Sequence, residues 1–282
     1  MKHLTKEWYT TMQKTGCHLL LETSNEANTF SEDFYQRLYR QKELQFVEQQ
    51  KHISEISIES IYPETFTFQP LDPTVVLTEE EYEKERIRYS AIRAEAIKNY
   101  VPKIFDLEKE KESFAYSQAF KIKDLQEKLT PEILSKVADI RVLALDTATA
   151  AVKNKIAAYC KHNFKTVNKT MKDYYHYHAG FLKAHPSQQF ECFAFHDCTL
   201  VSIEKQGADI EILFDNSGGF TGAEKILFKK AALKEQEGSL TGAKWLYEEI
   251  YEKDTRFEFH ALLSTRGGLA DLIIEADSLV IS

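Results

Sequence analysis

Glycine is distributed very unevenly along this chain of 282 residues. None occurs between Gly16 and Gly180, whereas eight of the ten glycines lie after residue 189. Glycine readily adopts a positive φ, which tight turns between strands often require and helices do not. The long gap therefore predicts a helix-rich first part, and the later glycines predict a β-rich second part connected by tight turns.

Capping signals in the first part predict where two helices begin. Thr78 and Glu81 form a capping box, and we expect the helix that follows to stop before Pro102. Thr130 and Pro131 are typical of an N-cap followed by the first helical position, and apolar spacing extends that helix to about residues 146–149. The other expected segments are a helix over 31–50, a helix from about 150 to 184, and an extended packed connector over 51–77.

After Pro186 the spacing of apolar residues changes from helical to alternating. Glycine-containing turns separate the strand candidates, and no helix-length insert lies between them, which favours an antiparallel sheet or small sandwich. The chain is thus predicted to be an α+β protein with a helical domain at 1–187 and an acidic antiparallel β domain at 188–282. The strand candidates are roughly 196–205, 208–216, 223–231, 244–251, 256–264 and 269–281.

Charge changes at the same boundary. The chain has 36 Lys and Arg against 44 Asp and Glu, and from residue 189 onward 9 basic residues stand against 17 acidic ones. The last 94 residues therefore carry a charge equal to the whole formal net charge of −8. Because such a field speeds encounter with basic surfaces, we expect a basic protein as partner. Without a basic block of five or more residues, we do not expect nucleic acid as a partner.

Several classes of protein are not expected. The first eight residues mix charge into every turn, which is unlike a secretory signal, and no uninterrupted apolar run is long enough to span a membrane. Four cysteines are too few for a disulfide scaffold. We therefore expect a cytoplasmic protein with reduced thiols and no cofactor, whose oligomeric state the sequence leaves open.

The first candidate site is the run of tyrosines and histidines at 174–178. On a helix His176 and His178 lie about 200° apart, so they cannot share a metal ion unless the helix breaks. The favoured interpretation is a helix that buries the bodies of these rings and leaves their polar tips hydrated or hydrogen-bonded. The alternative is a metal or general-base site formed by His162, Asp173, His176 and His178.

Two other motifs suggest chemistry. His196 and Cys198 point the same way from a strand, which would suit an activated thiolate, although a buried cysteine beside a capping histidine is favoured. Cys192 and Cys198 lack the second cysteine pair that a zinc site needs. Residues 216–222 are rich in glycine but lack the Lys-Ser/Thr of a phosphate-binding loop, so we expect a hairpin turn.

The segment 245–252 combines large aromatic and acidic side chains. Alternation places Trp245, Tyr247 and Tyr251 on one face with Glu249, and the neighbouring aliphatic residues on the other face with Glu248. Such a strand is suited to pack on one face and bind a partner with the other, although a strand that its own domain covers on both faces is slightly favoured. No catalytic residue is predicted, and the candidate partner-binding residues are Trp245, Tyr247, Glu248, Glu249, Tyr251 and Glu252.

Four segments of the chain, 1–9, 137–145, 195–198 and 245–251, resemble a family of Firmicutes proteins known as domain of unknown function 4085. This resemblance covers nearly the whole chain and implies neither a reaction nor catalytic residues. The last 90 residues are also similar to small immunity proteins that neutralise bacterial polymorphic toxins, through the His-Asp-Cys entry into a first strand, a glycine-containing turn and an acidic sheet.

Together these observations predict a non-enzymatic cytoplasmic binding protein, immunity-like, that acts through its acidic β domain. The alternative is a metal-dependent or general-base enzyme with its His/Tyr site on the helical domain.

Overall fold

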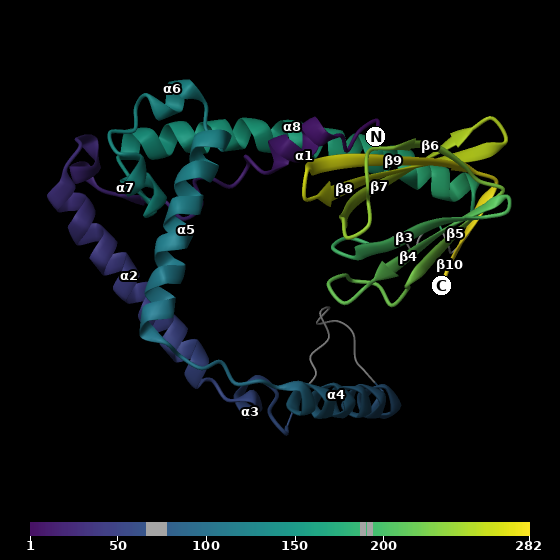
Figure 1. Cartoon of the computed structure of the whole chain (residues 1–282), viewed down its shortest axis with the longest axis horizontal. Helices are drawn as coiled ribbons and strands as arrows, with labels where there is room; N and C mark the ends of the chain where they lie inside the picture. Colours follow the sequence, from purple (N-terminus) through teal and green to yellow (C-terminus); the bar gives the residue numbers. More distant parts are fainter. Residues whose placement is uncertain (66–77, 187–189, 191–193) are drawn as a thin grey trace. The chain divides into compact units, whose positions relative to one another are not determined.

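The computed structural model describes residues 1–65, 78–186, 190 and 194–282, and the chain forms two compact units (Figure 1). The helical unit is Leu20–Lys153, and the sheet unit combines Met1–Leu19 with Asn154–Ser282. The sequence-based boundary near residue 187 follows composition. The structural division follows contacts instead, and groups the first 19 residues and most of the long helix Ala150–Ala184 with the sheet.

The helical unit contains a small apolar cluster. Its buried residues are Phe34, Leu38, Phe114, Val142 and Leu145. The predicted helices that follow the caps Ser31 and Thr78 are both confirmed, and Thr78 with Glu81 forms the expected capping box. The elements of this unit are β1 (Glu22–Thr23), a 3-10 helix (Asn25–Asn28), α2 (Glu32–Glu55), α3 (Ile58–Ile61), α4 (Glu79–Asn99), α5 (Leu107–Lys128), α6 (Pro131–Leu134), α7 (Ile140–Ala144) and β2 (Thr147–Ala148).

The structure corrects two predictions in this unit. The helix expected from Thr130 to about residue 146 is interrupted, because Asp139 caps a new helix by accepting from Arg141 N at 2.9 Å. The extended connector expected over 51–77 is helical through Glu55 and again in α3, and residues 66–77 lie outside the described part of the chain. The helix α5 has no counterpart among the predictions.

The sheet unit contains eight strands in the order β10-β5-β4-β3-β7-β8-β9-β6, with every neighbouring pair antiparallel. This confirms the predicted α+β class. Two strand predictions fail: β6 was not expected, and the single strand expected over 269–281 is divided at Asp277 into β9 and β10. The elements are α1 (Lys6–Met12), α8 (Ala150–Ala184), β3 (Thr199–Gln206), β4 (Asp209–Asp215), β5 (Lys225–Lys229), β6 (Ala232–Gln236), β7 (Lys244–Lys253), β8 (Arg256–Thr265), β9 (Gly268–Ala276) and β10 (Ser278–Ile281).

The eight strands form two layers (Figure 1). Strands β3 and β7 share only the ladder pair Thr199–Lys244, so the sheet folds over at this point. Strands β3, β4, β5 and β10 make one layer and β6 to β9 the other, as in a sandwich. Apolar residues from both layers fill the interior, among them Ile212, Phe228, Trp245 and Phe259. No helix among the described residues is long and apolar enough to cross a bilayer.

Candidate functional site

A β-bulge sets the two faces of β7. The pairing of β7 with β8 shifts register between Trp245 and Tyr247. A bulge adds one residue to one strand and so reverses the alternation beyond it. As a result Trp245 joins Ile250 in the core of the sandwich, while Tyr247 and Tyr251 face a separate apolar cluster. The prediction that Trp245 shares a face with Tyr247 is therefore wrong.

The outer face of β7 is covered by the sheet unit itself. Leu4 and Trp8 from the N-terminal segment (Met1–Met12) pack there with Tyr174 of α8, and the ring of Trp8 meets Tyr247 edge-on at 4.9 Å. Among the predicted partner-binding residues Trp245 and Glu249 are fully buried, Tyr251 is 5% exposed, and Tyr247 and Glu248 are half-buried. Only Glu252 is exposed, with His185 Nε2 3.2 Å from its carboxylate. A partner interface at this strand stays a prediction, one that requires the N-terminal segment to move.

The buried carboxylate of Glu249 holds the N-terminal segment in place. Its Oε2 accepts from Lys2 N at 2.7 Å, and its Oε1 accepts from His3 N at 2.8 Å and from Leu4 N. Three backbone donors compensate the loss of hydration of this buried charge. Glu249, proposed from the sequence as a partner-binding residue, thus binds the first turn of its own chain.

The free edge of β7 is closed by tyrosines of α8. Beyond the single pair with β3, the backbone N–H of Ile250 donates to Tyr174 Oη at 3.1 Å and that of Glu252 donates to Tyr177 Oη at 3.3 Å. Burial raises the pKa of the Tyr174 phenol. Side-chain acceptors here replace the neighbouring strand that would otherwise satisfy these buried donors.

A cavity of about 210 Å³ lies between α8 and β7. Tyr174, Tyr175 and His178 line it from the helix, and Tyr247 and Glu248 line it from the strand. Glu248 Oε2 accepts from the indole Nε1 of Trp245 at 2.7 Å, but burial outweighs this bond and raises the pKa of the carboxyl. Burial also lowers the pKa of His178, so both groups favour their neutral forms.

A larger hollow of about 710 Å³ lies between the turns at 237–243 and 265–270. Its walls are mainly glycine, serine and threonine, and its charged residues Glu237 and Arg266 are exposed. A site with converging buried ionisable groups is the better candidate for specific chemistry, which favours the smaller cavity.

The four residues of the predicted metal or general-base site do not come together. His162, Asp173 and His176 are exposed along α8, and only His178 borders the cavity. Within the described ranges, no group of three or more His, Cys, Asp or Glu side chains is arranged to hold a metal ion. Because α8 is continuous, His178 lies on the opposite side of the helix from His176, and His162 lies about three turns away from Asp173 along the helix axis.

Cys198 is enclosed in the core. It is fully buried, burial raises the pKa of its thiol, and a Cβ added to Gly219 would lie 2.2 Å from its Sγ. The glycine-rich turn at 216–222 therefore packs against the cysteine, which is consistent with the inert interpretation of Cys198. Cys192 lies outside the described residues.

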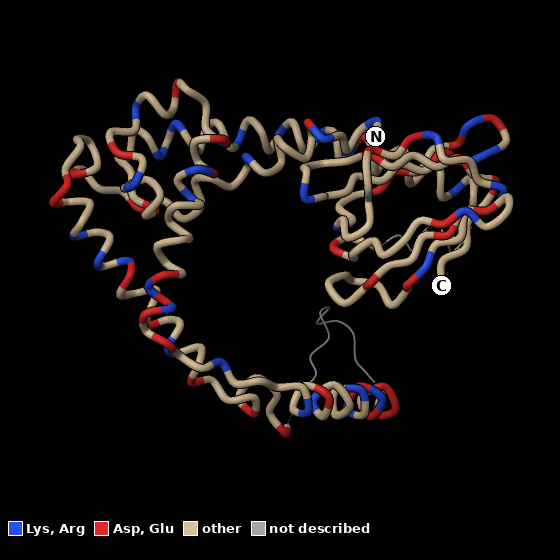
Figure 2. Tube along the Cα trace, viewed as in Figure 1, with Lys and Arg blue, Asp and Glu red and all other residues tan. Residues whose placement is uncertain are grey.

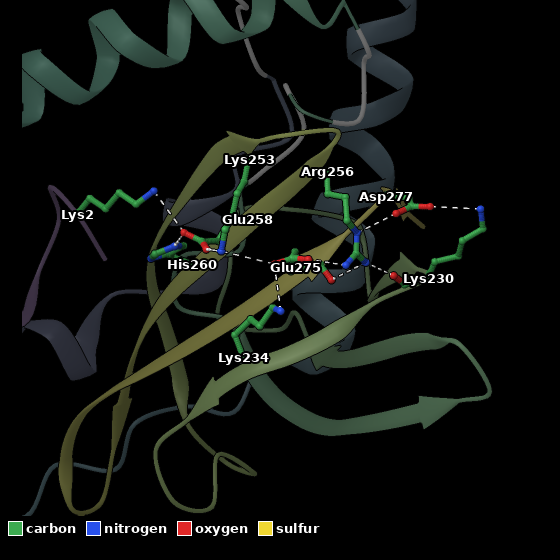
Figure 3. Close-up of polar contacts among 9 residues, drawn as sticks. All are labelled: Lys2, Lys230, Lys234, Lys253, Arg256, Glu258, His260, Glu275 and Asp277. Carbon is green, nitrogen blue, oxygen red and sulfur yellow. Dashed lines mark hydrogen bonds and ion pairs between the residues drawn. The ribbon is translucent and has the colours of Figure 1, made fainter.

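Acidic residues of β8 and β9 take part in a network of ion pairs (Figure 3). Lys253 Nζ lies 2.9 Å from Glu258 and 3.6 Å from Glu275, while His260 Nε2 donates to Glu258 at 2.8 Å. Burial alone would raise the pKa of Glu258, but hydrogen bonds from His260, Lys253 and Lys2 outweigh it and lower this pKa to about 2. Sequence reasoning missed this network because its members come from the start of the chain and from several strands and turns. They come together only when β6 to β9 pair and the first residues pack beside them.

The charge of the last 94 residues is offset inside the sheet unit (Figure 2). From residue 189 on there are 9 basic and 17 acidic residues; the first 19 residues and 154–188 add 9 lysines and 2 acidic residues. The sheet unit therefore holds 18 basic and 19 acidic residues, a net of −1. The helical unit holds the other 18 basic and 25 acidic residues, a net of −7. Because the whole sheet unit is nearly neutral, a basic partner could be attracted only by a locally acidic part of its surface.

These features define an α+β protein in which a two-layer antiparallel sandwich is completed by one long helix and an N-terminal segment bound by a buried glutamate. The chain belongs to the family described as protein of unknown function DUF4085, whose model matches residues 76–273. This match covers α4 to α8 and β3 to β8 and ends within β9, so it includes neither the N-terminal segment nor β10. No curated protein and no solved structure matches the chain.

Proposed function

We propose that the protein is a non-enzymatic binding module, and that a basic protein docks on the outer face of β3, β4, β5 and β10. An apolar stripe across this face carries the proposal. Leu227 lies directly beside Val280 in the register, and Leu213 is its diagonal neighbour on β4. The bulge residue Val201 of β3 adjoins Leu213, and Val201 and Val280 are 47% and 38% exposed.

The rim of this stripe is acidic. Lys225 pairs with Glu211 at 3.4 Å and Lys229 pairs with Asp209 at 2.8 Å. Glu204 and Asp215 project from the same face, and neither forms an ion pair with any described residue. An apolar centre beside uncompensated carboxylates suits a partner that presents apolar side chains together with lysine or arginine.

The likeness of the last 90 residues to toxin-immunity proteins supports the same kind of partner. A basic toxin domain has the charge that this face complements. The proposal keeps the basic partner expected from the sequence but places it on β3, β4, β5 and β10, because the chain itself covers β7.

The test compares two matched double variants in capture experiments from native lysate at low and high salt. Val201→Lys with Glu204→Lys changes one exposed apolar and one acidic residue on the proposed face. Ile87→Lys with Glu83→Lys makes the same change on α4 of the helical unit, where both side chains are also exposed.

We expect wild type and the α4 variant to retain a basic protein that salt releases, and the β-face variant to lose it. Tryptophan fluorescence unfolding checks that the β-face variant folds, because both tryptophans lie in the sheet unit, and far-ultraviolet circular dichroism checks the helical content of the α4 variant. Retention of every captured protein by a folded β-face variant would refute the proposal.

A further inference from the structure

We propose that the cavity between α8 and β7 binds a small organic cation, specifically a primary alkylammonium. Its charged group would contact Glu248, and its alkyl chain would lie among the rings of Tyr174, Tyr175 and Tyr247. This inference does not rest on the proposed function, because it concerns the opposite layer of the sandwich.

The carboxyl of Glu248 has no lysine or arginine partner among the described residues, and the imidazole of His196 is the charged group that acts on it from nearby. The Glu248 carboxyl projects toward the interior side of β7 beside Trp245, and no Lys or Arg in the described part of the chain forms an ion pair with it. Neighbouring Glu249 is different, because three backbone N–H groups already satisfy its oxygens. Even a half-buried carboxylate without a lysine or arginine partner is costly, and a bound ammonium would supply the missing positive charge.

The walls favour an organic cation over a metal ion. Three tyrosines line the cavity, and the π face of a tyrosine ring attracts ammonium groups that have lost their water. A metal ion would need four or more ligands, and of the two carboxylates among the described lining residues, Glu248 and Glu249, backbone donors already occupy that of Glu249. His178 stacks on Tyr174 at 5.6 Å and burial lowers its pKa, so the neutral ring does not repel a cation.

The volume limits the size of the ligand. A cavity of about 210 Å³ equals the liquid volume of roughly seven water molecules. It falls below the range of about 300–1,000 Å³ that is usual for sites of drug-sized molecules. A ligand of about five or six non-hydrogen atoms, such as butylammonium, fits; a nucleotide does not.

The two tryptophan side chains provide a direct readout. Trp245 Nε1 donates to Glu248, whereas Trp8 Nε1 donates to Val167 O at 3.1 Å. We expect n-butylammonium chloride to shift the indole N–H resonance of Trp245 saturably in a nitrogen–proton correlation spectrum, and to shift that of Trp8 much less. The Trp8→Phe variant assigns the two signals, and sodium chloride at matched ionic strength with neutral n-butanol serves as control.

Variants then locate the charged contact. Glu248→Gln should weaken butylammonium binding by at least about tenfold, because it removes a charge-assisted hydrogen bond. Glu252→Gln, an exposed change on the same strand, should leave the affinity unchanged. If Glu248→Gln does not fold, Tyr175→Ala is used instead. The Tyr175 side chain is 58% exposed, so the variant should fold, and loss of this ring should also weaken butylammonium binding.

Three results would overturn the inference. The first is the absence of a saturable Trp245 shift up to about 50 mM butylammonium, well above a millimolar dissociation constant. The second is an equal response to n-butanol, which would show an apolar cavity without a cation site. The third is unchanged affinity in folded Glu248→Gln, or in Tyr175→Ala where that variant must be used.

Discussion

Replacing Glu249 by glutamine tests how the N-terminal segment is held. The substitution preserves shape and one carbonyl oxygen, which can still accept from His3 N and Leu4 N. The amide nitrogen then faces the N–H of Lys2, so two donors oppose each other where Oε2 now accepts at 2.7 Å. One charge-assisted hydrogen bond is lost, and a partly buried donor is left without an acceptor.

The expected cost follows from these two losses. A hydrogen bond to a charged group contributes about 1.5–3 kcal/mol, and an unsatisfied buried donor costs about 1–3 kcal/mol. Part of this cost is offset, because the neutral glutamine loses less hydration free energy on burial than the carboxylate does. We expect Glu249→Gln to lower the free energy of unfolding of the sheet unit by about 2–4 kcal/mol.

Urea unfolding followed by tryptophan fluorescence measures this cost, because both tryptophans of the chain, Trp8 and Trp245, lie in the sheet unit. Amide hydrogen exchange at residues 2–4 should accelerate in parallel. The control is Glu235→Gln on β6, an exposed carboxylate without an ion pair to any described residue, which should change stability by less than about 0.5 kcal/mol. A Glu249→Gln variant as stable as this control would refute the reasoning.

Two further predictions concern the sheet unit. The pKa of Glu258 is lowered from 4.5 to about 2. The ionised carboxylate therefore contributes fully to the stability of the fold above pH 4.5, and this contribution is lost as the pH falls toward 2. The stability gap between wild type and Glu258→Gln in urea unfolding should therefore narrow by about 1–2 kcal/mol between pH 5 and pH 3, and a constant gap would contradict this. Gly219→Ala should cost about 1–3 kcal/mol, because its Cβ would lie 2.2 Å from Cys198 Sγ. A double variant that adds Cys198→Ala should cost less than the sum of the two single changes, and simple additivity would contradict the contact.

Elements that depend on local signals were predictable. The predicted caps Thr78 and Thr130 mark helix starts because the side chain of each accepts a hydrogen bond from the backbone of the first turn. Alternation found β4 and β8 because one face of each strand is buried. The prediction failed at β6, whose side chains are mostly exposed, so that no alternation marks it. It also failed at Asp139, where a capping carboxylate interrupts a favourable apolar spacing.

The candidate site was less accessible to sequence reasoning. The two candidate regions, the rings at 174–178 and the strand at 245–252, were identified separately, and the structure brings Tyr174 and His178 against Glu248 in one cavity. Nothing in either segment alone indicates that they meet, since about 70 residues separate them. The alternation of apolar and polar residues also did not predict the bulge after Trp245. An extra residue in one strand shows only in its pairing with the next strand, which the sequence does not give.

By itself the sequence determined that this protein has a glycine-poor helical part and a glycine-rich antiparallel part. The reason is local: a helix needs negative φ angles throughout, whereas tight turns between strands often need a positive φ, which glycine adopts most easily. Tertiary structure alone decided which charges remain uncompensated. Glu258 and Glu237 of the sheet unit pair with Lys2 and Lys6 from the start of the chain, because an electrostatic interaction depends on distance in space, whatever the separation in sequence.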